Sequence, residues 1–253
     1  MSKEARRKLD EMLRDLKLPG VGSCHAEAAS RAEKEGWGFE RFLHHVLDVE
    51  LEQRRQKRLE RVLKSSKLPA GKTMATLDLE RLPVKVRRQL PALIEGGFVD
   101  RGENLLAFGL PGRGKTHLVC ALGVELIQHG YTVHFTPAFA LVQRLLLARQ
   151  TYGLEKELRR LDAFDALIID DIGYIQQDRE EMEVLFTLLA ERYERRSVVI
   201  TSNLVFSQWD RIFKDPLTTQ GAIDRVVHHA VILELVGTSY RADSAADATG
   251  KAE

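Results

Sequence analysis

The sequence has few of the features that mark membrane, secreted or disulfide-bonded proteins. Among its 253 residues there are only two cysteines, Cys24 and Cys120, which lie far apart and in no paired-thiol or zinc-binding spacing. No run of about 18 apolar residues is present, which argues against a transmembrane helix. The opening stretch MSKEARRKLDEM lacks the apolar core of a signal peptide, so we expect a cytoplasmic protein. The formal net charge is only +1, so nucleic-acid binding would have to come from local basic patches.

Positive charge is concentrated near the N-terminus. The first 70 residues carry 16 Lys and Arg against 12 Asp and Glu, mostly in VELEQRRQKRLERVLKSSK. Apolar residues at helical spacing predict a long helix from about Phe39 to Lys64. Its basic half is either a solvated face or a face that meets DNA or a partner protein. Because SSKLPAG over 65–71 has the composition of a linker, we expect an N-terminal helical domain over 1–64.

The rest of the chain alternates between apolar runs and helical patterns. The runs LLAF, YTVHF, ALIIDD, VVITSN and AVILEL read as strands, with helical patterns between them. Unbroken apolar strands that alternate with helices indicate an α/β fold with a parallel sheet covered on both faces. We therefore predict a five-stranded parallel sheet within a domain over 72–241. The small polar residues of 242–253 predict a disordered tail.

The segment GLPGRGKTH is the most informative motif. Gly109, Gly114, Lys115 and Thr116 match the pattern G-x-x-x-x-G-K-[ST] of the phosphate-binding loop. Glycines let the loop curl so that its backbone N–H groups face an anion, and the following helix adds its positive N-terminal end. A plain glycine turn is the alternative, but the position between a strand and a helix favours the loop. We expect ATP to contact Gly109, Pro111, Gly112, Arg113, Gly114, Lys115, Thr116 and His117.

Polar residues follow two further predicted strands. Asp170 and Asp171 end ALIIDD, and carboxylates at the carboxyl end of a parallel strand point toward the ligand crevice. We expect Asp170 to hold Mg²⁺ together with Thr116, and Asp171 to polarise the attacking water. Asn203 ends VVITSN and could orient that water. Solvated acids at a strand end and an amide that caps a turn are the simpler alternatives.

These motifs, in this order, resemble the AAA+ ATPases of the DnaA/DnaC group, and most closely the IstB-like transposition helpers. GLPGRGKTHL, LIIDDIGY, VVITSN with FSQWDRIF, and AIDRVVHHAVILELVGTSYR carry the resemblance, which extends from about residue 35 to 241. It implies that VVITSN lies between the two nucleotide-motif strands and that Asn203 acts as sensor 1. It also implies that Arg225 is an arginine finger for a neighbouring subunit and that Arg241 is sensor 2; either could instead be a surface arginine. An active oligomer follows from a finger that acts in trans.

The chain departs from the AAA+ pattern at one catalytic position. Most AAA+ proteins carry glutamate where this chain has Asp171, although IstB-like members resemble it. Aspartate is one methylene shorter, so we expect slow basal hydrolysis and an ATP-timed switch.

The segment PAFALVQRLLLARQTYGLEKELRRLDAFD is longer than a simple helical crossover needs. In DnaA-group relatives an added helix in this region meets nucleic acid, and basic side chains there would bind phosphates without reading sequence. An amphipathic cover of the sheet is the alternative. The expected DNA contacts are Arg144, Arg149, Lys156, Arg159 and Arg160.

Three functions share this nucleotide motif. The first is an ATP-dependent factor that oligomerises on duplex target DNA and helps a transposase, with hydrolysis controlling disassembly. The second is a helicase loader resembling DnaC or DnaI that binds single-stranded DNA; DnaI-like loaders carry an N-terminal zinc module, for which this chain lacks suitable cysteines. The third is a small-molecule kinase, which leaves Asn203, Arg225 and the extended resemblance unexplained.

Overall fold

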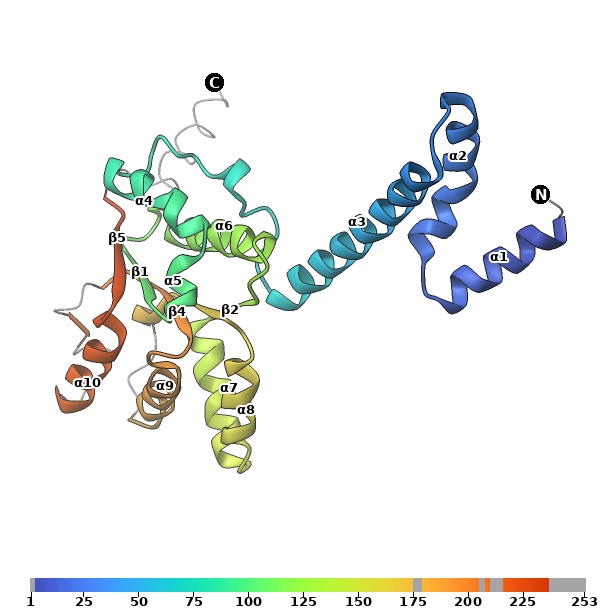
Figure 1. Cartoon of the computed structure of the whole chain (residues 1–253). Helices are drawn as coiled ribbons and strands as arrows, with labels where there is room; N and C mark the ends of the chain where they lie inside the picture. Colours follow the sequence, from blue (N-terminus) through green and yellow to red (C-terminus); the bar gives the residue numbers. More distant parts are fainter. Residues whose placement is uncertain (1–2, 175–178, 205–207, 210–215, 237–253) are drawn as a thin grey trace, which may run out of the picture. The chain divides into compact units, whose positions relative to one another are not determined.

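The computed structural model describes residues 3–174, 179–204, 208–209 and 216–236 (Figure 1). The chain divides into two compact units, 1–61 and 62–253. The predicted helix from Phe39 is confirmed and extends two residues beyond the expected end, to Ser66. Residues 65–66 of the expected linker therefore form the last turn of that helix. Among the described residues, no helix combines the length and the apolar character that crossing a bilayer requires.

The N-terminal unit contains α1 (Lys3–Asp15), α2 (Pro19–Glu35) and most of α3 (Phe39–Ser66). A small apolar cluster joins the three helices through Leu13, Val21, Ala28 and Val46. Glu50 of α3 is buried and accepts hydrogen bonds from the backbone N–H groups of Gly20 (2.6 Å) and Val21 (3.1 Å). This carboxylate satisfies free N–H groups in the first turn of α2, so it adds a polar link between α2 and α3 to the apolar cluster.

The second unit is built on a five-stranded sheet with the order β2-β3-β4-β1-β5, in which all pairs are parallel. This confirms the predicted α/β fold and places β4 between β1 and β3, as the resemblance implied. Its strands are β1 (Asn104–Phe108), β2 (Val133–Pro137), β3 (Ala166–Asp170), β4 (Ser197–Ser202) and β5 (Ala230–Glu234).

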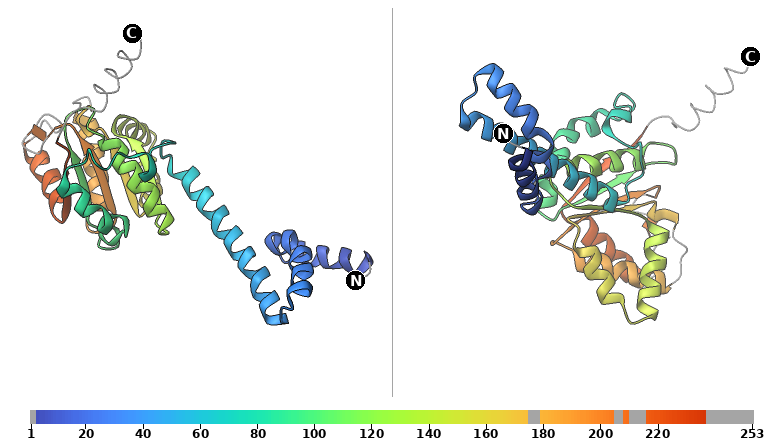
Figure 2. Two further views of the ribbon diagram at one scale, coloured as in Figure 1. Left: turned by 90° about the horizontal axis from the view of Figure 1, so that it is seen from above. Right: turned by 90° about the vertical axis from the view of Figure 1, so that its right-hand side faces the viewer.

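Helices cover both faces of this sheet (Figures 1 and 2). One face carries α6, whose Leu118, Val119 and Leu122 are buried. The other face packs against α7, α9 and α10 in an extended apolar cluster. The bounds are η1 (Met74–Thr76), α4 (Val84–Ile94), α5 (Gly97–Asp100), α6 (Lys115–Gln128), α7 (Ala138–Gln150), α8 (Leu154–Asp162), η2 (Ile172–Tyr174), α9 (Arg179–Arg192) and α10 (Pro216–Val227).

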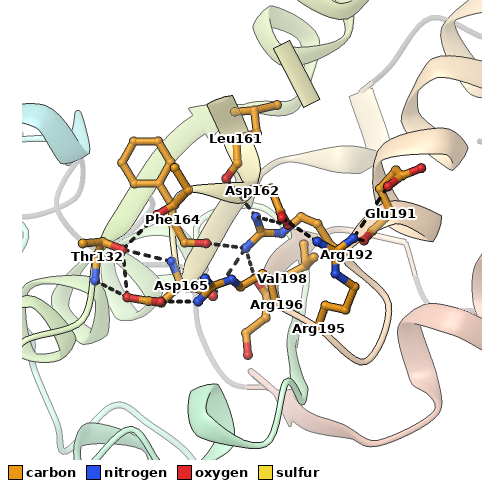
Figure 3. A network of polar contacts seen from close by, with 12 residues as sticks. Thr132, Leu161, Asp162, Phe164, Asp165, Glu191, Arg192, Arg195, Arg196 and Val198 are labelled. Carbon is orange, nitrogen blue, oxygen red and sulfur yellow. Dashed lines mark hydrogen bonds and ion pairs between the residues drawn. The ribbon is translucent and has the colours of Figure 1, made fainter. Parts of the chain in front are cut away.

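A buried arginine holds together the N-terminal ends of the neighbouring strands β3 and β4 (Figure 3). The guanidinium of Arg192, which is 1% exposed, donates to the carbonyl oxygens of Leu161 (2.9 Å), Phe164 (2.9 Å) and Ser197 (3.0 Å). Burial lowers the pKa of Arg192 to about 10, which still leaves the group charged at neutral pH. Arg192 therefore links the end of α8 to the starts of β3 and β4. This is the end of the sheet opposite the carboxyl ends of the strands.

Candidate functional site

The phosphate-binding motif forms the loop between β1 and α6, as predicted. Gly109 lies so close to the chain after β5 that an added Cβ would stand 2.5 Å from the carbonyl oxygen of Leu235. Gly114 caps the N-terminus of α6 with φ of 80°, in the left-handed region that glycine adopts without strain. The first turn of α6 thus presents free N–H groups at the loop, the arrangement that binds anions.

Lys115 is the first residue of α6 and is 5% exposed. Its ammonium donates to the carbonyl oxygens of Gly109 (2.7 Å) and Leu110 (3.1 Å), so it lies along the inside of the loop. A buried cation held this way supplies positive charge where a phosphate group would enter.

The expected magnesium ligands meet directly. The Thr116 hydroxyl donates to the two carboxylate oxygens of Asp170, at 2.8 and 3.1 Å. A third residue, Thr201 of β4, donates its hydroxyl to Asp170 Oδ1 at 2.6 Å. Hydroxyl and carboxylate oxygens are ligands that Mg²⁺ prefers, so Thr116 and Asp170 fit the role expected of them.

Asp171 turns the chain sharply after β3. Its φ is 60°, a left-handed conformation uncommon outside glycine but tolerated best by Asn and Asp. Its backbone N–H donates to Thr201 Oγ1 at 2.8 Å, so one threonine holds both acidic residues. Sequence reasoning missed Thr201; its place two residues before the end of VVITSN, on the strand beside the acids, was the only available signal.

A cavity of about 230 Å³ opens beside the loop. Two of its lining residues, Lys72 and Leu77, come from the segment before the nucleotide-binding motifs and were not predicted. That segment is fastened to α6, because Thr76 Oγ1 lies 3.0 Å from Nε2 of His117. The other lining residues are Pro111, Gly112, Arg113, Gly114, Lys115, Thr116, His117 and Asp171, all of them predicted site residues.

Asn203 lies beside the acidic turn but is not among the described residues that line the cavity. It is half-buried just after β4, and its Oδ1 atom is buried without a hydrogen-bond partner among the described atoms. A Cβ added at Gly173, within η2, would stand 2.0 Å from that oxygen. Glycine at 173 therefore makes room for the amide next to Asp171.

Arg225 does not line the cavity either. It is half-buried on α10, where its guanidinium stacks over the ring of Phe186 from α9, 4.7 Å from the ring centroid. One of its nitrogens also donates to the carbonyl oxygen of Gly221 at 3.2 Å. Arg241 lies outside the described residues.

The predicted DNA-contact residues lie on α7 and α8, which form a helical hairpin, and most are engaged in ion pairs. Arg144 and Arg160 both pair with Glu157, at 2.7 and 2.8 Å, and Arg144 is half-buried. Arg149 pairs with Glu183 at 3.0 Å and Arg159 with Glu155. Lys156 is exposed. Acidic neighbours thus offset part of the positive charge that the sequence suggested.

Sequence analysis did not single out two aromatic residues near the α7–α8 hairpin. His134 is buried and stacked on Phe164, and burial, with the nearby charges of Arg144 and Arg160, lowers its pKa to about 4. It is therefore neutral at physiological pH. Tyr152, in the turn between α7 and α8, is 100% exposed and has φ of 55°.

The parallel sheet, the loop and the Thr116–Asp170 pair define a P-loop ATP-binding protein with the fold of the DnaA/DnaC group of AAA+ proteins. The sequence further matches the family described as "IstB-like ATP binding protein" over residues 11–248, and the chain belongs to that family.

Relatives agree with this family assignment, and solved structures agree with the fold. The chain is 43% identical over 242 residues to an insertion sequence ATP-binding protein of Sinorhizobium fredii, covering 95% of this chain and 81% of that one. It is 37% identical to an ATP-binding protein of insertion sequence IS21 from Pseudomonas aeruginosa, covering 92% and 88%. The DnaC helicase loader superposes with a TM-score of 0.52 at 17% identity, over 60% of this chain and 89% of the loader. DnaA from Aquifex aeolicus superposes with a TM-score of 0.55 at 19% identity, over 67% and 51%; at these identities the likeness concerns the fold.

Proposed function

We propose that this chain is an ATPase that binds duplex DNA, oligomerises on it, and helps the transposase of an insertion sequence. The observation that carries the proposal is the meeting of a phosphate-binding loop, the Thr116–Asp170 pair and Asp171 at one site, in a member of the IstB-like family. Its relatives are named as ATP-binding proteins of insertion sequences, which supports a role in transposition.

The first part of the proposal is ATP hydrolysis. The loop N–H groups and Lys115 bind the phosphates, and Thr116 and Asp170 hold Mg²⁺, which when bound neutralises charge on the phosphate oxygens. Asp171 orients the attacking water, with Asn203 beside it. Because the Asp171 side chain is short and its backbone is held by Thr201, it reaches the water poorly, so basal turnover is slow.

The second part is assembly. Arg225 stands on α10, outside the lining of its own cavity, and its stacking on Phe186 holds the guanidinium in one place. We assign it to the nucleotide of a neighbouring copy, where it stabilises the charge of the transition state. The rate of ATP turnover then depends on protein concentration, and ATP hydrolysis leads to disassembly of the oligomer.

The third part is DNA binding by the α7–α8 hairpin. Exposed Lys156 is available to phosphates directly, whereas Arg149, Arg159 and Arg160 each exchange an acidic partner for phosphate. Replacing Arg149, Arg159 and Arg160 with glutamine should weaken binding and lower the salt slope by about 0.9 for each phosphate that is no longer neutralised. Arg87→Gln with Arg88→Gln, exposed on α4, is the matched control. Unchanged binding by the triple variant would remove this part of the proposal.

The experiment that tests the whole proposal is light-scattering mass with and without ATP, on duplex and on single-stranded DNA of equal length. Large ATP-dependent complexes on duplex DNA alone are expected. A preference for single strands would instead indicate a helicase loader, and no assembly on either DNA would contradict the role given to Arg225.

A further inference from the structure

Three side chains of the kinds that ligate metals lie close together at the end of the sheet where the strands begin, opposite the nucleotide site. Glu194 follows α9, and His228 and His229 lie between α10 and β5. Each offers one ligand atom, and these three atoms lie within 4.8 Å of one another. The two imidazole rings have centroids 4.0 Å apart, and His228 Nδ1 is 3.8 Å from Glu194 Oε1. Segments more than thirty residues apart thus bring their ligands to one exposed point.

The backbone at this point is held in an uncommon conformation. Glu194 and His229 have φ of 55° and 67°, in the left-handed region that residues other than glycine rarely adopt. The His229 carbonyl accepts the N–H of Asn104, the first residue of β1, at 3.2 Å. An added Cβ at Gly102 would stand 3.2 Å from the Glu194 carbonyl oxygen. Strained residues persist where surrounding contacts hold them, and they gather at functional sites.

We propose that Glu194, His228 and His229 form a binding site for a divalent transition-metal ion, with Zn²⁺ as the best match. Two imidazoles and one carboxylate are a typical zinc ligand set, whereas Mg²⁺ and Ca²⁺ select oxygen ligands. All three residues are exposed, so water completes the coordination. Tyr193 Oη lies 2.8 Å from His228 Nδ1, the same nitrogen that faces Glu194 Oε1, so an ion that coordinates this nitrogen takes the place of the Tyr193 hydrogen bond.

An ion at this site would link the end of α9 to the end of α10. His228 follows α10 directly, three residues after Arg225, and Arg225 stacks on Phe186 of α9. Zinc would therefore stiffen the helix that carries Arg225. Metal binding itself does not depend on the function proposed above, because it is measured without nucleotide or DNA.

The test is calorimetric titration of the tag-free full chain with ZnCl₂, in a chelator-free buffer that contains excess Mg²⁺. One ion per chain is expected. His228→Ala with His229→Ala should weaken binding by at least about tenfold, as should Glu194→Gln, which preserves the size of the side chain. His129→Ala, at an exposed histidine after α6, and Cys24→Ser are the matched controls and should bind as the parent does. Far-UV circular dichroism of the metal-free variants establishes that they are folded.

Two results would overturn the proposal. One is the absence of saturable zinc binding by the parent chain. The other is undiminished binding by the folded His228→Ala, His229→Ala variant, which would place the ion elsewhere. Cobalt(II) gives a second readout, because a four-coordinate site with nitrogen and oxygen ligands produces visible absorption that both His228→Ala and Glu194→Gln should remove.

Discussion

The Thr116 hydroxyl donates to the Asp170 carboxylate across 2.8 Å, which joins the first turn of α6 to the end of β3. Segments that are 54 residues apart thereby meet at the proposed magnesium site. Asp170→Asn keeps the shape but removes the charge that attracts the ion. We expect ATP turnover to fall at least about a hundredfold, measured by phosphate release over a range of Mg²⁺ concentrations. Glu180→Gln, an exposed acid-to-amide change on α9, should have no effect. Normal turnover by Asp170→Asn would exclude Asp170 as the metal ligand.

The second prediction concerns Thr201, because its hydroxyl forms hydrogen bonds with both acidic residues. It donates to Asp170 at 2.6 Å and accepts the backbone N–H of Asp171 at 2.8 Å. Thr201→Val keeps the shape and removes both bonds, so it should cost about 1–3 kcal/mol of unfolding free energy and slow turnover. Thr201→Ser retains the hydroxyl and is the control. If valine and serine variants hydrolyse ATP equally fast, Thr201 does not position the acids.

Gly173 provides a test of Asn203. An added methyl group would stand 2.0 Å from Asn203 Oδ1, so Gly173→Ala should displace the amide from the acidic turn. The expected result is slower ATP hydrolysis with nucleotide affinity retained, measured by single-turnover kinetics and nucleotide titration. Gly22→Ala, on α2 with open space around it, should leave turnover unchanged. Equal turnover in both variants would argue against a role for Asn203 in orienting water.

The N-terminal unit should depend on pH through Glu50. Burial opposes the charged form, but hydrogen bonds from Arg54, Val21 and Gly20 outweigh it, and the pKa of Glu50 lies below its ordinary value. A lowered folded pKa means that this stabilisation is complete above the unfolded pKa of about 4.3 and is lost as pH falls through the folded value.

Glu50→Gln should therefore destabilise α2 at pH 7 and make less difference as pH falls below about 4. Amide hydrogen exchange in the first turn of α2 measures the effect. The control is Glu40→Gln, an exposed acid-to-amide change at the start of α3. A difference between parent and Glu50→Gln that is the same at pH 7 and pH 3.5 would contradict the linkage.

The motifs of the nucleotide site could be predicted from sequence because the chemistry fixes their spacing. The glycines lie on one loop, Lys115 and Thr116 begin the helix that follows it, and Asp170 ends an apolar strand, so local pattern and strand direction place them. The five strands could be predicted as well, because buried parallel strands are uninterrupted apolar runs.

The remaining site residues depend on tertiary packing that no local pattern encodes. Lys72 and Leu77 reach the cavity because the segment before α4 is fastened to α6 through Thr76 and His117. The ion pairs of Arg144 and Arg160 with Glu157 require α7 and α8 to pack as a hairpin. Contacts between side chains of different helices and strands therefore could not be predicted from the sequence alone.

The most direct test of the central claim, an ATPase whose site is completed by a second copy, is ATP turnover in mixtures of two inactive variants. Lys115→Ala lacks its own phosphate site but keeps Arg225, and Arg225→Ala keeps its phosphate site. We predict that each variant alone is nearly inactive and that mixing them on duplex DNA restores turnover, because Arg225 of one copy serves the site of the other. No recovery in mixtures that still assemble by light scattering would contradict the account.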